Sequence, residues 1–551
     1  MDNLKKLPIG YENFKKLIED NAYYVDKTKV IEEIRNKGGM VSLFPRPRRF
    51  GKTLFMSMLN EFFNIEYIKD NKNLFKDLYI EKSPYYKELS SSPVIFLSFK
   101  GITGNSYEDV YMMIKELIRS LYSSKRYLKD KLESDEIKIF DDFLNETAED
   151  SKYMQSLKIM SEYLYKYYNR KVIILIDEYD VPIQDGYLKG YYDEVINLIK
   201  GMFSSVLKTN DYLEFGIMTG ILRVSKESIF SDLNNVDVYG ITDSYYNDYF
   251  GFTESETREL LSYYNLKLNK EVKDMYDGYN FNKVSIYNPW SIINYANRKI
   301  LVPYWVNTSS NNLIKETISK CSDNVKVIIE RLISGSDVNF RYNDKITYLD
   351  LRNYNSIDTV LNFFLMSGYL TTTNDFSLLN DINKIKIPNG EVKRLFTDII
   401  KEYITGENIS IYNELIYDFN KAILNKDKIV IENTLNKALS SMSYYDNKES
   451  FYHGYSLGLF LNFLTDKEYI LKSNREAGMG RYDIAITKKD RSIGIIIEFK
   501  IADTNENIEK YAKKAIKQMR DKEYYKELVL DKVEDISCYA IVFKDKRCIV
   551  R

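Results

Sequence analysis

The sequence predicts a multidomain α/β protein with an N-terminal parallel sheet, a helical middle region and a smaller C-terminal α/β domain. First, apolar runs such as Val172–Ile176 have the length and composition of strands buried on both faces. Second, helical patterns separate these runs, as in the strand–helix–strand units of a parallel sheet. Third, 551 residues are too many for a single hydrophobic core.

The first apolar run, residues 40–44, leads into a candidate phosphate-binding loop at residues 45–53 (Pro-Arg-Pro-Arg-Arg-Phe-Gly-Lys-Thr). Backbone N–H groups of such a loop and the N-terminus of the following helix favour an anion. Lys52 can reach the β and γ phosphates, and the Thr53 hydroxyl can ligate Mg²⁺. Arg46 stands where the consensus has its first glycine, so the turn out of the strand must be made differently, with Pro45 and Pro47 as candidates.

The run Val172–Ile176 ends in two carboxylates, Asp177 and Glu178. In a nucleotide site Asp177 would hold the magnesium shell and Glu178 would polarise the attacking water. Further buried strands are expected at residues 94–99 and 213–219. Thr219, at the end of the latter, is placed for a γ-phosphate sensor, although strand-end threonines more often cap or bond the backbone. The predicted nucleotide-binding residues are Arg49, Phe50, Gly51, Lys52, Thr53, Asp177, Thr219 and Arg223, with Thr53 and Asp177 at the metal.

A second constellation lies near the C-terminus. Asp483 falls within a predicted strand at residues 481–486, and Glu498 and Lys500 fall within the next, at residues 493–500. Strand side chains have period two, so Glu498 and Lys500 leave the same face. Alone they could be surface charges on an edge strand, but the run of isoleucines around them indicates a buried strand, where unpaired charge is costly. Asp483 and Glu498 suit Mg²⁺, and Lys500 can orient water, which predicts hydrolysis of a nucleic-acid backbone.

Two accessory residues are candidates for this site. Gln518 lies on a predicted helix at residues 507–526, whose basic stripe of Lys510, Lys514 and Lys517 either follows phosphates or is a solvated face. Glu449, four residues before His453, is either a further acidic ligand or a solvated charge.

Both ends of the chain resemble known families. Residues 481–500 resemble the PD-(D/E)XK nuclease superfamily, which implies catalytic roles for Asp483, Glu498 and Lys500 and a metal at the two carboxylates. Much of the chain resembles the AAA-ATPase-like family of uncharacterised bacterial proteins, in which the loop usually contains arginines and a PD-(D/E)XK domain commonly ends the chain. The resemblance implies a P-loop ATPase and a nuclease, with ATP and Mg²⁺ as cofactors. It rests on Leu7-Pro8-Ile9-Gly10, Tyr24-Val25-Asp26-Lys27-Thr28, Arg46-Pro47-Arg48-Arg49-Phe50-Gly51-Lys52-Thr53, Thr219-Gly220, Gly251-Phe252-Thr253-Glu254, Tyr276-Asp277-Gly278-Tyr279, Tyr287-Asn288-Pro289-Trp290 and Ile387-Pro388-Asn389-Gly390-Glu391-Val392.

Composition excludes several classes of protein. With 79 Lys and Arg against 80 Asp and Glu, any nucleic-acid surface must be local. Three unpaired cysteines and a single histidine exclude zinc sites and histidine-based triads. The N-terminus lacks a signal-peptide core, and no apolar run reaches the roughly 18 residues of a membrane span, so a cytoplasmic protein without membrane contact is expected.

The expected domains are an ATPase domain at residues 1–238, a lid and winged-helix-like region at 239–440 and a nuclease-like domain at 441–551. Thr253 to Glu256 has capping-box spacing and should begin a lid helix. Strands near 368–373 and 384–387, followed by a helix capped by Asn389, outline a wing, which binds DNA in some proteins and only packs in others.

Three functions are compatible with these patterns. The first is a Mg²⁺-dependent nuclease, acting on nucleic acid and most simply DNA, under the control of ATP. The second is a nucleotide-dependent switch whose last domain binds DNA or a partner without cutting. The third is a nuclease with a vestigial ATP site. Homo-oligomers are expected if a neighbour's arginine completes the ATPase site.

Overall fold

The computed structural model describes residues 4–551 except 38, 69–70, 224–234, 307–310, 355, 406–408, 441–459, 461–462, 464–467, 478–479, 503–506 and 545–546. The chain forms two compact units, Met1–Leu313 with Asn339–Glu391, and Ile314–Val338 with Val392–Arg551. The middle region expected at residues 239–440 is therefore divided between the two units.

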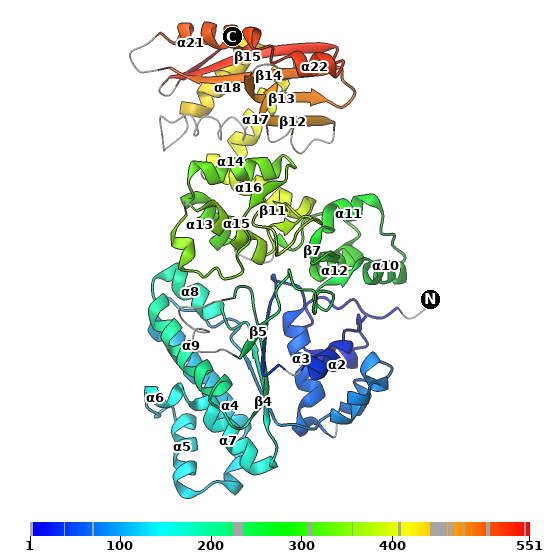
Figure 1. Ribbon diagram of the computed structural model, residues 1–551, viewed down its shortest axis with the longest axis vertical. Helices are drawn as coiled ribbons and strands as arrows, with labels where there is room; N and C mark the ends of the chain where they lie inside the picture. The colour runs from blue at the N-terminus through cyan, green and yellow to red at the C-terminus, as the bar shows by residue number, and fades with distance from the viewer. Residues whose placement is uncertain are drawn as a thin grey trace. The chain divides into compact units, whose positions relative to one another are not determined.

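The first unit contains a five-stranded parallel sheet in the order β2-β3-β4-β1-β5 (Figure 1). The four strands expected from the apolar runs are present, and β3 is buried along its whole length. Because the strands are parallel, the loop after β1 and the carboxylates at the end of β3 open at the same edge of the sheet. Only β4 lies between them. The strands are β1 (Val41–Pro45), β2 (Val94–Ser98), β3 (Val172–Asp177), β4 (Leu213–Gly220) and β5 (Val236–Val238).

Helices cover both faces of this sheet, with α1 to α3 on one side and α4 to α9 on the other (Figure 1). The helices are α1 (Phe14–Glu19), α2 (Lys29–Lys37), α3 (Lys52–Phe63), α4 (Tyr107–Ser124), α5 (Ser134–Leu144), α6 (Asp150–Tyr153), α7 (Ser156–Tyr168), α8 (Val181–Lys189) and α9 (Tyr192–Leu207). Short 3-10 helices are η1 (Ile65–Tyr67), η2 (Asn71–Asn73), η3 (Tyr79–Lys82), η4 (Pro84–Glu88), η5 (Arg126–Lys131) and η7 (Asp350–Arg352).

The rest of the first unit combines three helices with a small antiparallel sheet. The helices are α10 (Glu254–Tyr263), α11 (Lys270–Tyr276) and α12 (Pro289–Arg298), and the sheet has the order β6-β8-β7, from β6 (Phe252–Thr253), β7 (Tyr279–Phe281) and β8 (Val284–Tyr287). The predicted capping box is present, because Thr253 Oγ1 accepts from the Glu256 N–H and Glu256 Oε2 accepts from the Thr253 N–H.

The expected wing strands also pair. After α15 (Ile357–Met366), β10 (Thr371–Thr372) runs antiparallel to β11 (Asn383–Lys386), and β9 (Val338–Phe340) completes a three-stranded sheet. Helix α16 (Gly390–Thr405) begins one residue after Asn389. A DNA-binding role for this hairpin stays a prediction.

The buried carboxylate of Glu391 holds the backbone of Tyr304 and Trp305 in place within the first unit. Its side chain accepts hydrogen bonds from Ser291 Oγ at 2.8 Å, from the Trp305 N–H at 2.6 Å and from the Tyr304 N–H, and it is fully buried. Burial raises the pKa of Glu391 to about 7, against the opposing effect of these three donors. The ionised carboxylate is therefore costly in the folded state despite being well bonded.

We expect Glu391→Gln to stabilise the first unit at pH 8 but not at pH 5. Because the folded pKa lies above the unfolded value, the contribution of Glu391 to stability is complete below pH 4.5 and is lost as the pH rises through about 7. The loss is at most about 3 kcal/mol, and glutamine avoids it while still accepting from the backbone and donating to Ser291. Thermal unfolding followed by tryptophan fluorescence tests this, since Trp290 and Trp305 both lie in this unit. Lower stability of the variant at both pH values would contradict it.

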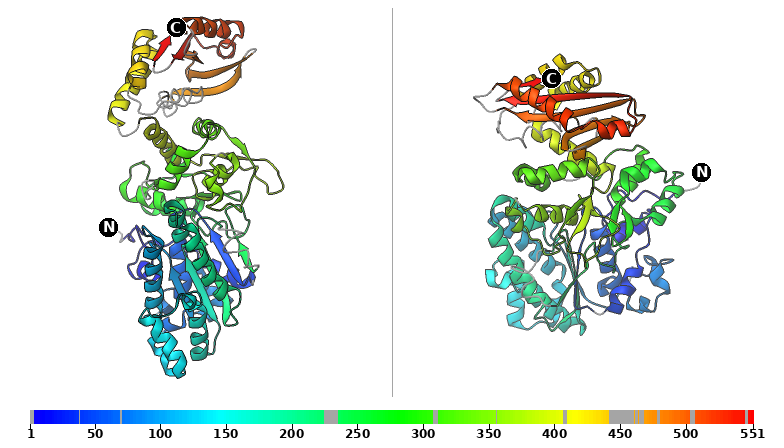
Figure 2. Two further views of the ribbon diagram at one scale, coloured as in Figure 1. Left: turned by 90° about the vertical axis from the view of Figure 1, so that its left-hand side faces the viewer. Right: turned by 45° about the horizontal axis from the view of Figure 1, so that its top comes forward.

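The second unit contains a five-stranded mixed sheet in the order β12-β13-β14-β15-β16, in which only β14 and β15 are parallel. One face packs on α17 and α18 through a large apolar cluster, and the other packs on α21 and α22 (Figure 2). Its elements are α13 (Asn312–Lys320), α14 (Asp323–Ile333), α17 (Ile409–Leu424), α18 (Lys428–Ser440), β12 (Tyr469–Ala477), β13 (Gly480–Lys488), β14 (Ile493–Ile501), α21 (Ile508–Asp521), α22 (Lys526–Leu530), β15 (Asp535–Lys544) and β16 (Arg547–Val550).

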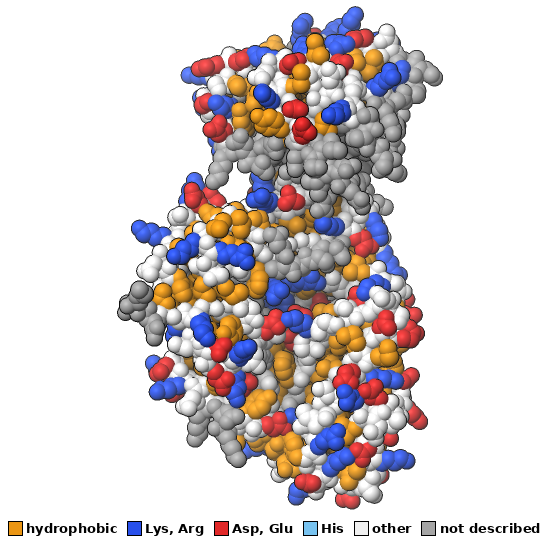
Figure 3. All heavy atoms as spheres, turned by 180° about the vertical axis from the view of Figure 1, so that it is seen from behind, with side chains coloured by type: hydrophobic (Ala, Val, Ile, Leu, Met, Phe, Trp, Pro, Cys, Tyr) orange, Lys and Arg blue, Asp and Glu red, His pale blue; other side chains and the backbone are white. Residues whose placement is uncertain are grey.

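Acidic and basic side chains are mixed on the surface. On the face shown in Figure 3 they are interspersed, in keeping with a net charge of −1. Of the helices that the structure describes, none has the length and apolar character needed to cross a membrane.

Candidate functional sites

The loop after β1 turns into α3 through a left-handed residue. Gly51 is the N-cap of α3 and has φ 89°, a conformation that glycine adopts without the steric cost of a Cβ atom. Arg49, also at positive φ (66°), turns the chain just before it. Residues 52 and 53 form the first turn of α3, so its unpaired N–H groups open where a phosphate would bind.

Lys52 is folded back onto its own loop. Its Nζ donates to the carbonyl oxygens of Arg46 at 2.9 Å and Pro47 at 3.0 Å, and the side chain is buried. Burial lowers the pKa of the Lys52 ammonium, while the carboxylates of Glu178, Asp180 and Asp177 oppose that effect. The lysine thus occupies the centre of the loop and must exchange carbonyl partners for phosphate oxygens when it binds a nucleotide.

Arg46, which replaces the consensus glycine, is a buried structural residue. Its guanidinium donates to the carbonyls of Tyr239 and Tyr246 (3.0 Å to the latter) and lies over the rings of Phe250 and Phe281. Burial lowers its pKa to about 9, against the charge of Asp243. The side chain fixes the base of the loop and is not among the residues that line the cavity on the other side of it, described below. Sequence reasoning did not assign Arg46 this role.

Thr219, near the end of β4, bonds the carboxylate of Asp177 and the backbone of Glu178. Thr219 Oγ1 donates to Asp177 Oδ1 at 2.6 Å and accepts from the Glu178 N–H at 3.4 Å. Glu178, directly after β3, adopts positive φ (52°), which is strained for a non-glycine residue. Burial, followed by the charges of neighbouring Asp177 and Asp180, raises the pKa of Glu178, while Lys52 opposes the shift. Thr219 therefore positions the Asp177 carboxylate and the backbone of Glu178, and its role as a phosphate sensor stays a prediction.

The structure places Arg223 beside Pro45, at the start of the phosphate loop, in an ion pair with Asp344. Its Nη1 donates to Asp344 Oδ2 at 2.9 Å, and it lines a separate small cavity of about 30 Å³ with Pro45 and Tyr342. Any action of Arg223 on a nucleotide would require it to leave Asp344.

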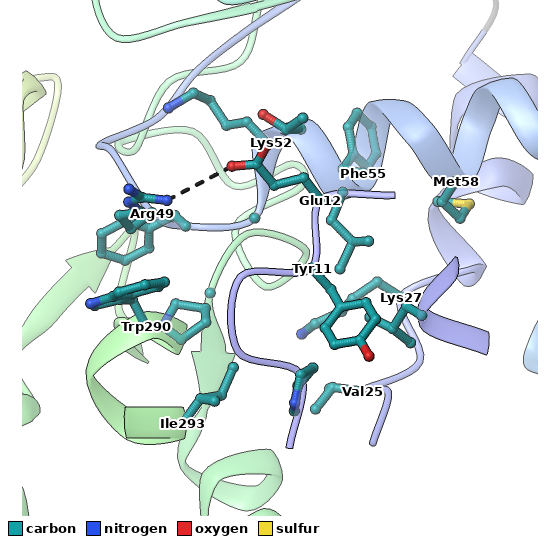
Figure 4. Close-up of a pocket in the computed structure, with 18 of the residues that line it drawn as sticks. Tyr11, Glu12, Val25, Lys27, Arg49, Lys52, Phe55, Met58, Trp290 and Ile293 are labelled. Carbon is teal, nitrogen blue, oxygen red and sulfur yellow. Dashed lines mark ion pairs between the residues drawn. The ribbon is translucent and has the colours of Figure 1, made fainter. Parts of the chain in front are cut away.

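A cavity of about 390 Å³ lies beside the loop, within the size range of small-molecule sites (Figure 4). Its polar end is formed by loop residues 48–53 with Glu178 and Lys100, and the rest is largely aromatic and aliphatic. The apolar part includes Tyr11, Tyr23, Val25, Phe55, Met58, Trp290 and Ile293. A charged end joined to an aromatic end matches the chemistry of a nucleotide.

The segments that carried the family resemblance meet around this cavity. Pro8, Val25, Gly251 and Trp290 come from four separate segments and all line it. The sequence analysis assigned no role to Trp290, Tyr11, Glu12 or Lys100, which also line the cavity. Trp290 belongs to one of the motifs that carried the resemblance, which was a signal for it, whereas Tyr11, Glu12 and Lys100 belong to none of them.

The C-terminal site lies where β13 and β14 separate. The ladder between them ends at the pair Ile484 and Ile497. At the next position Asp483 Oδ2 accepts from the Phe499 N–H at 2.7 Å, so this side chain replaces a backbone partner. Asp483 is thereby fixed opposite Glu498, on the face of the sheet that α21 covers.

Glu498 is the buried centre of this site. Its Oε1 accepts from Lys500 Nζ at 2.8 Å, which confirms that the two side chains share one face, and from Gln518 Nε2 at 2.8 Å. Burial and then the charge of Asp483 raise the pKa of Glu498 to about 7, opposed by Lys500 and Lys522. Gln518 also donates to Tyr524 Oη at 2.8 Å, which anchors it on α21.

Helix α21 has one apolar and one basic side. It buries Ala512, Ala515 and Met519 and exposes Lys510, Lys514 and Lys517, so the predicted basic stripe is present. Glu449 and His453 lie outside the described residues, and the accessory role of Glu449 stays a prediction.

The donor set at Glu498 fits a divalent cation. Glu498 Oε2 is buried and accepts no hydrogen bond from the residues that the structure describes, which is costly for a carboxylate unless a cation or proton compensates it. Asp483 stands beside it, and two carboxylates with bound waters are a usual Mg²⁺ set. Within the described part of the chain, no cluster of three or more acidic, histidine or cysteine side chains is close enough to bind a metal.

Comparison with known proteins defines the class. Residues 8–230 match the family model described as "Predicted AAA-ATPase", and residues 447–551 match that of the PD-(D/E)XK nuclease superfamily. The chain thus has an AAA-ATPase-like domain and a C-terminal PD-(D/E)XK nuclease superfamily domain, which confirms both predicted resemblances. It is similar to a protein of Azotobacter chroococcum mcd 1 described as an uncharacterized protein in the vnfD 5′ region. The two are 24% identical over 529 residues, which covers 94% of this chain and 93% of the relative.

Proposed function

We propose that the first unit binds and hydrolyses ATP with Mg²⁺ and that the nuclease-superfamily domain cleaves nucleic acid, most simply DNA, under the control of the nucleotide state. The observation that carries the ATP proposal is that Gly51, Lys52 and Glu178 line the same cavity as several aromatic side chains. Glu178 would polarise the attacking water, and Thr53 and Asp177 would hold the metal.

The nuclease half rests on the convergence of Asp483, Glu498 and Lys500 with an unbonded buried carboxylate oxygen. Asp483 and Glu498 would hold Mg²⁺, which when bound neutralises charge on the phosphate and lowers the pKa of a water. Lys500 would orient the water or offset charge on the phosphate. Gln518 would keep Glu498 in its rotamer through the bond to Tyr524.

The test of the combined proposal is cleavage of single- and double-stranded DNA by the purified chain with Mg²⁺, with and without ATP. Cleavage that responds to ATP supports the proposal, and cleavage indifferent to ATP would leave a nuclease with a vestigial nucleotide site. Specific DNA binding without cleavage, under all these conditions, would favour the nucleotide-dependent switch.

Trp290 offers a direct test of nucleotide binding. We expect ATP to change the tryptophan fluorescence, and Trp290→Ala to weaken ATP binding about 5- to 100-fold, because stacking on a base contributes about 1–3 kcal/mol. Trp290→Phe, which keeps an aromatic face, should lose less. Trp305→Phe is the matched control, since Trp305 is outside the cavity lining but bonds the Arg48 carbonyl. Equal affinity in Trp290→Ala and wild type would place the base elsewhere.

A further inference from the structure

The cavity beside the phosphate loop contains a charged group that neither sequence motif includes. Glu12, on the segment before α1, accepts from Lys100 Nζ with both carboxylate oxygens at 2.5 Å. The same carboxylate pairs with Arg49 Nη1 at 3.8 Å (Figure 4). All three residues line the cavity. Three segments far apart in the chain thus bring two cations and one anion to its polar end.

Lys100 is placed at the edge of the sheet where the reaction would occur. It follows β2 by two residues, and Ser98, the last residue of β2, is in register with Asp177 of β3. The charge of Lys100 acts on Glu178, so the ammonium lies near the carboxylate that would polarise water. Arg49 belongs to the phosphate loop itself, and its guanidinium lies 4.7 Å from the centre of the Trp290 ring.

We infer that Lys100 and Arg49 bind the terminal phosphate of the nucleotide and that Glu12 is the counter-ion they hold when no nucleotide is present. The inference rests on the proposed ATP binding; it adds Lys100 and Glu12 to the site and gives the predicted residue Arg49 a specific role. Phosphate oxygens carry more charge than a carboxylate and make strong charge-assisted bonds with lysine and arginine. The terminal phosphate therefore replaces Glu12.

The weakness of the Glu12 contacts makes this exchange feasible. The side chains of Lys100, Glu12 and Arg49 are 48%, 40% and 37% exposed. Ion pairs at such exposure change an equilibrium constant by a factor of about five at most. Glu12 lowers nucleotide affinity only slightly and releases the N-terminal segment when it is displaced.

A purely structural clamp would behave differently from a competing counter-ion. If Glu12 only held the N-terminal segment against the cavity, its removal would loosen the wall and weaken nucleotide binding. If Glu12 competes with phosphate, its neutralisation tightens binding. The two readings thus predict changes of opposite sign.

Calorimetric titration of the full chain with MgATP and MgADP tests the inference. We expect Glu12→Gln to bind ATP about two- to fivefold more tightly than wild type. Lys100→Met should weaken ATP binding about tenfold and ADP binding much less, because a charge-assisted bond to the terminal phosphate is lost. The double variant should resemble Lys100→Met, since Glu12 then has little left to compete for.

Two controls, Lys76→Met and the wild type, distinguish a failure of this inference from a failure of ATP binding. Lys76→Met, at an exposed position outside the cavity lining, should leave both affinities unchanged. Weaker or unchanged ATP binding by Glu12→Gln at an unaltered melting temperature would overturn the inference, as would equal losses of ATP and ADP affinity in Lys100→Met. Failure of the wild type to bind either nucleotide would instead overturn ATP binding itself, and the inference with it.

Discussion

Lys500→Ala is expected to reduce Mg²⁺-dependent cleavage of nucleic acid by at least about 10²- to 10³-fold, the usual loss when a group that stabilises transition-state charge is removed. Lys500 bonds the buried Glu498 at 2.8 Å, and its own side chain is only 25% exposed. Its removal deletes the ammonium that faces the phosphate and leaves Glu498 with more uncompensated charge. The measurement is the single-turnover cleavage rate at saturating Mg²⁺.

The matched control is Lys489→Ala, an exposed lysine in the turn before β14, at the opposite end of the strand from Lys500. It should cut at the wild-type rate. Cleavage by Lys500→Ala at that same rate would exclude the assigned chemistry, whereas unchanged DNA affinity with lost cleavage separates catalysis from binding. The melting temperature of each variant distinguishes lost chemistry from lost folding.

Lys52→Ala is expected to weaken ATP binding by about 10²-fold or more, since charge-assisted bonds to the β and γ phosphates are each worth about 1.5–3 kcal/mol. In the nucleotide-free state the same ammonium bonds the carbonyls of Arg46 and Pro47, so the variant also loses some order in the loop. Equilibrium binding of MgATP provides the measurement, with Lys76→Ala as an exposed control.

The effect of Lys52→Ala on cleavage distinguishes the functional hypotheses. If nucleotide state controls the nuclease, the variant cuts as wild type does without ATP, and added ATP has no effect on it. If wild type and variant cut equally in the presence of ATP, the nucleotide site does not act on the nuclease. Unchanged ATP affinity would contradict the assignment of Lys52 altogether.

Much of the architecture could be predicted from local pattern. The strands of the parallel sheet, the capping box at Thr253 and the shared face of Glu498 and Lys500 all follow from periodicity within a few residues. These features depend on short-range geometry, which a sequence states directly.

What could not be predicted depends on contacts between distant segments. The cavity needs Trp290 of α12 and Tyr11 of the N-terminal segment on the same side of the loop, and no periodicity reports that. The sequence predicts that Arg223 reports on or completes the nucleotide site, and that stays a prediction, but nothing in the local pattern indicated its ion pair with Asp344, 121 residues away. Long-range ion pairs of this kind leave no local pattern.

The burial of Arg46 has a consequence for how the protein folds. In a loop that has glycine at the position of Arg46, the strand and the following helix are enough to define the turn. Here the guanidinium takes its partners from Tyr239 and Tyr246, about 200 residues along the chain. We therefore expect the loop to reach its final shape only after that distant segment has docked beside β1, because contacts between residues far apart in sequence carry a high loop-closure cost. A fragment ending before residue 239 would contain every residue of the loop and still lack the groups that shape it.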